Sequence, residues 1–181
     1  MVYIFMADGT EEIEALTVVD LLRRAGIEIK TVSVEKTNDI LGSHGIPIKC
    51  DINLSDVSAL PEMIVLPGGK KGTETLKANE TLADLIRKQN DRNGYLAAVC
   101  AAPTIYGEMG LLMGRSATCY PGLEEKLIGA KVQSPDVTVA VDDNFITSRG
   151  LGTSIDFALK IIELLLSKED SDKIAKQVVY R

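Results

Sequence analysis

Cys100 is the residue in this sequence that is best placed to act as a nucleophile. It follows the apolar run 95–99, which has the length of a buried strand, and precedes the segment 101–104, where a helix is expected to begin. A side chain on such a turn projects from the carboxyl end of a sheet, and the N–H groups of a helix N-terminus favour a thiolate. Because free cysteines are among the most buried residue types, a packing role for Cys100 is the competing interpretation.

Glu14 is the candidate acid–base partner of this cysteine. On a helix it lies in line with the apolar residues Val18 and Leu21, so its carboxyl group is expected to be partly buried. Burial raises the pKa of a carboxyl group, and a protonated carboxyl can donate a hydrogen bond that lowers the pKa of a neighbouring thiol. The alternative is that Glu14 only complements the helix dipole, which is the interpretation we prefer for Glu11 and Glu12.

A pair of glycines, Gly68 and Gly69, follows the buried run 63–66. Glycines allow backbone N–H groups to approach a ligand closely, so this turn is a candidate oxyanion site. The spacing to Gly72 fits no P-loop or dinucleotide motif, and by itself it indicates only a strand-to-helix turn. Because the carboxyl ends of parallel strands share one crevice, we expect Gly69, Cys100 and the start of the Glu14 helix to lie together.

The elements that must position these residues alternate between strand and helix patterns. Buried strands are expected at 2–6, 29–34, 63–66 and 95–99, helices at 10–25 and 79–89, a hairpin at 36–51, further strands at 116–120, 132, 137–141 and 145–148, a tight turn at 142–144, and a last helix capped by Thr153 or Ser154. This alternation predicts an α/β fold, a three-layer sandwich on a mostly parallel sheet with helices on both faces and a small hairpin excursion.

Composition limits the partners and the location of the protein. The 181 residues, 45% of them hydrophobic, predict a single domain over 1–181. The net charge of −6 has no basic block, so neither nucleic acid nor a membrane surface is an expected partner. No apolar stretch approaches the roughly 20 residues of a membrane span, and the N-terminus lacks a secretory pattern, so a cytoplasmic location is expected. Cys50, Cys100 and Cys119 are expected to be reduced thiols, and the single histidine, His44, argues against a zinc site.

Five segments, taken in order, are similar to motifs of a known family. They are residues 7–14, 23–26, 65–69, 98–104 and 147–154. With these segments at these spacings, the chain resembles the DJ-1/ThiJ/PfpI superfamily, close to its DJ-1/ThiJ branch, over nearly its whole length.

The resemblance implies a flavodoxin-like fold and a homodimer. It also implies an oxidisable cysteine at the nucleophile elbow, placed on Cys100, with Glu14 as its carboxylic acid partner. Backbone N–H groups of Gly69 and Ala101, with Gly68 and Tyr120 beside them, would form the oxyanion and substrate pocket. No cofactor and no metal is implied. Activities attributed to this branch include conversion of methylglyoxal or glyoxal to hydroxy acids, removal of early glycation adducts from proteins, protection against oxidative stress and chaperone-like holding.

The chain also departs from the family pattern. Tyr120 stands where many relatives carry a histidine, so no Cys–His dyad is expected. Ala101 replaces the histidine that protease-like relatives place after the nucleophile, which counts against peptidase activity. Class I glutamine amidotransferases need a histidine downstream of the cysteine, whereas His44 lies upstream of it, so amidotransferase activity is not expected. Arg24 matches an arginine near the family's anion-accepting cleft, but His44 replaces the second arginine and is expected to be a surface histidine. Leu151 replaces a proline common in the last motif.

Two functional hypotheses remain open on the sequence. In the first, Cys100 and Glu14 convert a 2-oxoaldehyde to a 2-hydroxy acid without a cofactor. In the second, oxidation of the Cys100 thiolate to a sulfinate is the functional event of a redox sensor or stress chaperone. A phosphoacceptor receiver domain is excluded, because Leu66 is followed by Pro67 and two glycines where the acceptor aspartate would be required.

Overall fold

A central sheet of seven strands organises the protein, whose computed structural model describes residues 1–180. The strand order is β10-β11-β7-β6-β1-β2-β5. All neighbours are parallel except β10 and β11, which are antiparallel. The strands are β1 (Val2–Met6), β2 (Ile29–Ser33), β5 (Ile52–Asn53), β6 (Met63–Leu66), β7 (Tyr95–Val99), β10 (Val139–Asp142) and β11 (Phe145–Ser148).

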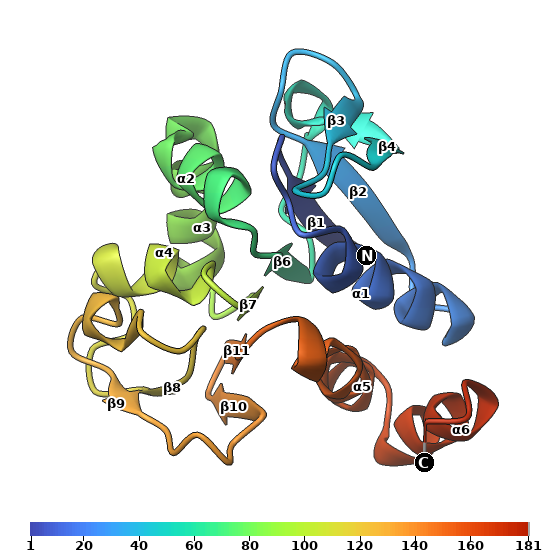
Figure 1. The fold of residues 1–181 in the computed structure, drawn as a ribbon, viewed down its shortest axis with the longest axis vertical. Coiled ribbons are helices and arrows are strands. Elements are labelled where there is room, and N and C mark those ends of the chain that lie inside the picture. The colour runs from blue at the N-terminus through green and yellow to red at the C-terminus, as the bar shows by residue number, and fades with distance from the viewer. Residues whose placement is uncertain (181) are drawn as a thin grey trace.

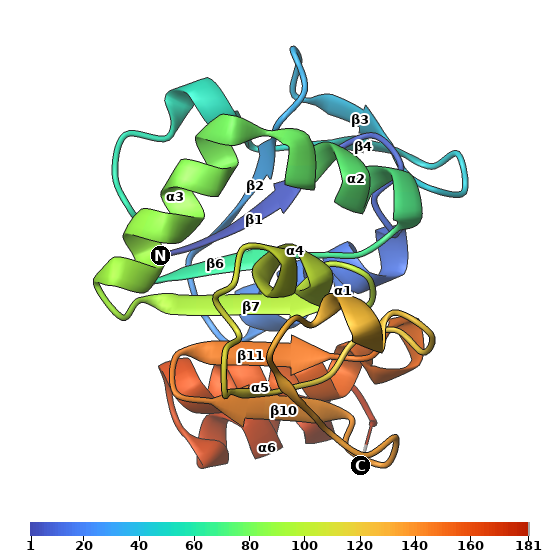
Figure 2. The same ribbon diagram turned by 90° about the vertical axis from the view of Figure 1, so that its left-hand side faces the viewer.

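Helices cover both faces of this sheet (Figures 1 and 2). They are α1 (Glu12–Arg24), α2 (Lys70–Ala78), α3 (Glu80–Asp91), α4 (Pro103–Glu108), α5 (Ser154–Leu165) and α6 (Lys168–Gln177). Figure 1 shows α1, α5 and α6 on one side and α2, α3 and α4 on the other. Strands β1 and β6 are buried along their whole length, because apolar clusters cover them from both sides. The predicted α/β, flavodoxin-like sandwich is confirmed.

Several element boundaries differ from the sequence prediction. Helix α1 begins at Glu12 and not at Thr10, because the Thr10 hydroxyl accepts a hydrogen bond from the Ala7 N–H and closes the preceding turn. Helix α3 begins one residue after Asn79, whose side chain accepts from the Leu82 N–H and caps the helix. The sequence prediction did not include α6.

Two small paired units lie outside the main sheet. The expected hairpin is present as β3 (Asp39–Leu41) and β4 (Pro47–Lys49), which pair antiparallel. The strand expected at 116–120 is only β8 (Ser116–Ala117), paired with β9 (Lys131–Val132). It ends there because the chain turns toward the end of β7, where the Tyr120 N–H donates to the Cys100 carbonyl.

A tight turn joins β10 to β11, as the sequence predicts, and Asp143 adopts a left-handed φ of 55° in it. Within residues 1–180 no helix is both long and apolar enough to cross a membrane.

Candidate active site

Cys100 occupies a sharp turn between β7 and α4. Its φ of 65° lies in the left-handed region, which is uncommon for a residue with a side chain and marks local strain. Two hydrogen bonds hold this conformation: the Cys100 N–H donates to the Ser148 carbonyl over 3.0 Å, and the Cys100 carbonyl accepts from the Tyr120 N–H over 2.7 Å. The cysteine is only partly buried, unlike Cys50 and Cys119. The turn therefore presents its sulfur at the carboxyl end of the sheet.

Glu14, in the first turn of α1, brings its carboxyl group to this sulfur. The residue is 2% exposed, and its Oε2 accepts a hydrogen bond of 2.9 Å from the Gly68 N–H. Burial raises the pKa of Glu14 to about 7, and the negative charge of Glu11 acts in the same direction. Hydrogen bonds from Cys100, Gly68 and the Leu151 N–H oppose this rise. Glu14 can therefore either hold or release a proton near neutral pH.

Gly68 and Gly69, which follow β6, are needed because other segments of the same chain pass very close to their backbone. A Cβ on Gly68 would lie 2.5 Å from the Glu14 Oε2 and 2.5 Å from the Cys100 Cβ. Gly69 has a φ of 91°, and a Cβ there would lie 2.2 Å from the Gly9 carbonyl oxygen. The absence of side chains lets the Gly69 N–H, together with that of Ala101, hydrogen-bond the cysteine sulfur. These N–H groups lie where an oxyanion pocket was expected.

The pKa of Cys100 differs from the sequence prediction. Burial raises the pKa of this thiol to about 12, and the charge and hydrogen bond of Glu14 add to the rise, while the Gly69 and Ala101 N–H groups oppose it. The expected lowering by Glu14 is therefore wrong for the state in which Glu14 is ionised, because a carboxylate next to the sulfur repels a second negative charge. The two groups titrate as a unit: while Glu14 is ionised the remaining proton stays on the sulfur, and a thiolate is present only in the form in which Glu14 keeps that proton.

A cavity of about 570 Å³ opens beside the pair. Its walls are Glu11, Glu14, Gly69, Lys70, Thr73, Glu74, Lys77, Cys100, Ala101, Thr104, Glu108, Tyr120, Pro121, Leu123, Lys126 and Leu151. Tyr120 is 52% exposed at this cavity, in the place where a histidine would have provided a dyad. Helix α2 forms one wall of the cavity through Lys70, Glu74 and Lys77, and the sequence did not lead us to expect them there. Their spacing of four and three residues, directly after Gly69, places them on one helix face and could have indicated this wall.

Arg24 does not reach this cavity within the chain. It lies in the last turn of α1, whereas Glu14 lies in the first, and its guanidinium pairs with Asp20 over 2.6 Å on the surface. The Asp20 hydrogen bond raises the pKa of Arg24 further. The anion contact expected for Arg24 is therefore not part of the site as this chain builds it.

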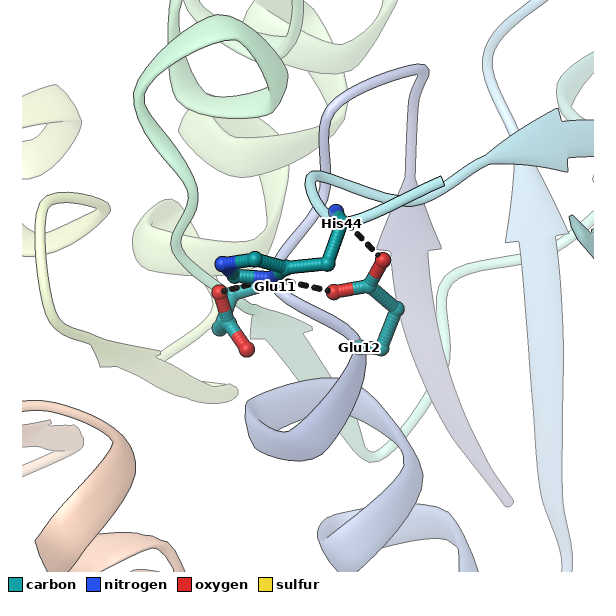
Figure 3. Close-up of side chains that lie close together, drawn as sticks. All are labelled: Glu11, Glu12 and His44. Carbon is teal, nitrogen blue, oxygen red and sulfur yellow. Dashed lines mark hydrogen bonds and ion pairs between the residues drawn. The ribbon is translucent and has the colours of Figure 1, made fainter. Parts of the chain in front are cut away.

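Figure 3 shows His44 against Glu11 and Glu12 at the start of α1. The Ser43 hydroxyl also donates to both carboxylates. We call this cluster of Glu11, Glu12, Ser43 and His44 the hairpin clasp. The His44 Nδ1 lies 3.0 Å from the Glu12 Oε2 and 3.4 Å from the Glu11 Oε2, and the His44 N–H donates to the Glu12 Oε1 over 2.7 Å. Burial would raise the pKa of Glu12, but hydrogen bonds from its own backbone and from His44 and Ser43 lower it to about 2. The sequence interpretation of Glu12 as a simple dipole partner was thus incomplete.

Three members of the clasp, Glu11, Glu12 and His44, are also the one group of possible metal ligands found among residues 1–180. Both Glu12 oxygens already accept hydrogen bonds from the hairpin, which accounts for this buried carboxylate without an ion. We therefore interpret the cluster as a connection between the β3–β4 hairpin and α1.

Comparison with known proteins agrees with this arrangement. The family model described as DJ-1/PfpI family matches residues 1–164. The chain belongs to the DJ-1/PfpI family. Protein DJ-1 homolog A of Arabidopsis thaliana is 38% identical over 182 residues, covering 99% of this chain, although the match spans only 46% of that longer protein. Protein dj-1beta of Drosophila melanogaster is 37% identical over 96% of this chain and 93% of its own length.

Two relatives add structural and functional information about this DJ-1/PfpI family. The oxidized DJ-1 of Toxoplasma gondii superimposes with a TM-score of 0.94 at 35% identity, covering 99% of this chain and 97% of that one. A Caenorhabditis elegans relative, named glutathione-independent glyoxalase DJR-1.2, is 31% identical over 93% of this chain and 90% of its own length.

Proposed function

We propose that the protein is a cofactor-independent enzyme that converts 2-oxoaldehydes, such as methylglyoxal, to 2-hydroxy acids, such as lactate. One observation carries the proposal: a strained, partly exposed cysteine hydrogen-bonds a buried carboxyl group at the wall of an open cavity. The glyoxalase name of the C. elegans relative supports the same chemistry. The cavity is much larger than methylglyoxal, which leaves glycated protein side chains as a second proposed substrate class.

The first step is addition of the Cys100 sulfur to the aldehyde carbon. The reactive form is the singly ionised pair in which the sulfur carries the charge and Glu14 keeps the remaining proton, so one form supplies both the nucleophile and the acid. As the carbon–sulfur bond forms, the carbonyl π pair moves to oxygen, where the Gly69 and Ala101 N–H groups stabilise the negative charge. Glu14 donates its proton to this oxygen and becomes a carboxylate, which yields a hemithioacetal.

The second step is an internal proton transfer through the same carboxyl group. The Glu14 carboxylate removes the proton from the former aldehyde carbon, the freed electron pair forms a carbon–carbon double bond, and the ketone π pair moves to its oxygen, which gives an enediolate. Glu14 returns its proton to the adjacent carbon, and the proton of the first hydroxyl passes to the former ketone oxygen. The first oxygen thereby becomes the carbonyl of a thioester on Cys100, and the second becomes the hydroxyl of the product. Water attacks the thioester carbonyl, releases the 2-hydroxy acid and restores the cysteine. The sum is addition of one water molecule to the 2-oxoaldehyde, without an external oxidant.

The purified protein is expected to form lactate from methylglyoxal without glutathione or added metal. In deuterium oxide, the lactate should carry deuterium at its C2 position, because the proton held by Glu14 exchanges with solvent during the enediol stage. Chromatography and mass spectrometry of the product check both results. Absence of lactate would contradict the proposed activity, and lactate without deuterium would contradict the enediol route.

A second candidate function is redox sensing or stress protection through the same sulfur. Cys100 is accessible while Cys50 and Cys119 are each 2% exposed. Burial raises the pKa of all three thiols, to about 11 for Cys50 and about 12 for Cys100 and Cys119, so the difference between them is access to an oxidant and not the pKa. Oxidation is therefore expected to concentrate on Cys100, and the oxidized state named for the Toxoplasma relative supports this alternative.

We also propose that the protein forms a homodimer. Helix α1 exposes Ile13 and Leu16, and the adjoining hairpin exposes Leu41 and Ile46, so neighbouring elements present apolar side chains to solvent. Sedimentation equilibrium is expected to give twice the chain mass of 19.5 kDa, with Leu16→Glu shifted toward the single-chain mass. Met113→Glu, at an exposed methionine remote from α1 in the sequence, is the matched control and should keep the dimer mass.

A further inference from the structure

His44 belongs to the hairpin but lies against the end of α1 that carries the catalytic carboxyl group. Its ring is 69% exposed, and its Nδ1 lies 3.0 Å from Glu12 and 3.4 Å from Glu11 (Figure 3). The hydrogen bond to Glu12 raises the pKa of His44, and the charges of Glu11 and Glu12 add to the rise. When its imidazole is protonated, the hairpin therefore places a positive charge beside the first turn of α1.

Glu11 connects this charge to the active site. Its N–H donates to the Gly68 carbonyl over 3.0 Å, and the Gly68 N–H in turn donates to Glu14, so one short loop ties both glutamates in place. Glu11 also lines the cavity, and its side chain is only 13% exposed. Its charge disfavours ionisation of Glu14. A cation next to Glu11 offsets part of the repulsion between the Glu11 charge and an ionised Glu14.

We propose that His44 is a positioning residue that tunes the Glu14–Cys100 pair electrostatically, acting through Glu11. The groups involved are few. The charged groups that face His44 are Glu11, the N-cap residue of α1, and Glu12 in its first turn, and its own loop adds only the Ser43 hydroxyl. The titratable groups that act on Glu14 are Cys100 and Glu11, while the β6–α2 loop and Leu151 contribute backbone N–H groups.

The direction of the effect follows from the charges. The pair becomes a monoanion when it loses its first proton, wherever the charge then resides. Glu11 opposes this loss and protonated His44 favours it, so removing the imidazolium should move the loss to higher pH. As the pH rises and His44 itself becomes neutral, its assistance ends, which gives the hairpin a pH-dependent influence on the site. An arginine at this position would keep its charge throughout.

The test is the pH dependence of Cys100 alkylation by iodoacetamide, followed by peptide mass spectrometry in the full-length protein. His44→Gln is expected to raise the alkylation midpoint by about 0.5 pH unit, the size expected for loss of a partly screened unit charge. His44→Arg should keep the wild-type midpoint. Glutamine retains a side-chain donor for Glu12, and the residue 44 backbone N–H is unaffected, so the hairpin contact persists in both variants. The difference between the variants should shrink in about 1 M salt.

A double-mutant comparison checks the route through Glu11. Glu11→Gln is expected to lower the midpoint, and in that background His44→Gln should have a smaller effect than in the wild type. Equal midpoints for wild type, His44→Gln and His44→Arg overturn the inference. Equal upward shifts in both His44 variants would mean that the imidazole acts only as a structural contact, and this also overturns it. An undiminished His44→Gln shift in the Glu11→Gln background overturns the proposed route.

The inference rests on the pair used in the proposed function, but its readout is separate from turnover. If the wild type makes no lactate while the midpoints shift as expected, the proposed function fails and the inference stands. If lactate forms but the midpoints coincide, only the inference fails.

Discussion

Cys100→Ser is expected to lower methylglyoxal turnover by about 10³-fold or more, because a serine hydroxyl stays protonated where a thiol can ionise. The same substitution should remove the addition of two oxygens that mild peroxide is expected to produce. Serine preserves the size of the side chain and leaves both backbone hydrogen bonds of the turn available. The loss would therefore report chemistry at the sulfur and not collapse of the turn. Lactate assays and intact-mass analysis of the same samples measure the two effects.

Cys119→Ser is the matched control for this prediction. Cys119 is adjacent in sequence to Tyr120 but buried, and it does not line the cavity. This variant is expected to retain turnover and to gain two oxygens on Cys100. Turnover that survives Cys100→Ser would disprove the proposed mechanism. Peroxide addition spread over all three cysteines would disprove the redox alternative without affecting the enzymatic one.

Glu14→Gln is expected to lower turnover by about 10²- to 10⁴-fold, the usual contribution of a general acid–base. Glutamine can still donate a hydrogen bond to the sulfur, but it cannot give up or take a proton, so hemithioacetal protonation and enediol formation both lose their catalyst. Removal of the carboxylate also removes the charge that raises the pKa of Cys100. A thiolate should therefore still form while turnover is lost, which separates the two roles of Glu14. Alkylation rates and lactate assays, compared side by side, measure this separation.

The pH profile gives Glu14 a second signature. Glu14 has a pKa of about 7, and both members of the pair are protonated below it. Wild-type kcat/KM should therefore fall as the pH drops through 7 and reach a plateau above it. This limb should be absent or displaced in Glu14→Gln but retained in Glu74→Gln, which removes another cavity carboxylate. A limb near pH 7 that persists unchanged in Glu14→Gln would contradict the assignment of that ionisation to the pair.

Local sequence patterns were sufficient to predict the main features of the site. The apolar run before Cys100 and the proline after it identify the strand-to-helix turn, and the parallel sheet requires its neighbours at the same edge. Glu14 was found because a carboxylate within an apolar helix stripe must be buried. The paired glycines were found as a close approach of backbone, and the structure adds that a Cβ on Gly68 would collide with both Glu14 and Cys100.

Long-range contacts decided the features that the patterns missed. The anion contact expected for Arg24 stays a prediction, and within the chain Arg24 lies at the opposite end of α1 from Glu14, where it pairs with Asp20. His44 was expected to be a lone surface histidine, and its ring is indeed 69% exposed, but the hairpin folds back on α1 and brings it to Glu11 and Glu12. No periodicity records that contact, because it joins residues more than 30 positions apart.

The sequence by itself determined the fold class, the cysteine at the strand end and its carboxyl partner, since burial patterns and turn residues are local properties of the chain. Only the tertiary structure decided which way the pKa of Cys100 moves and which charges act on the pair. Charge interactions depend on distance and on the water excluded between groups, and both are set when separate segments pack together. The protonation chemistry of this site is therefore a property of the assembled fold.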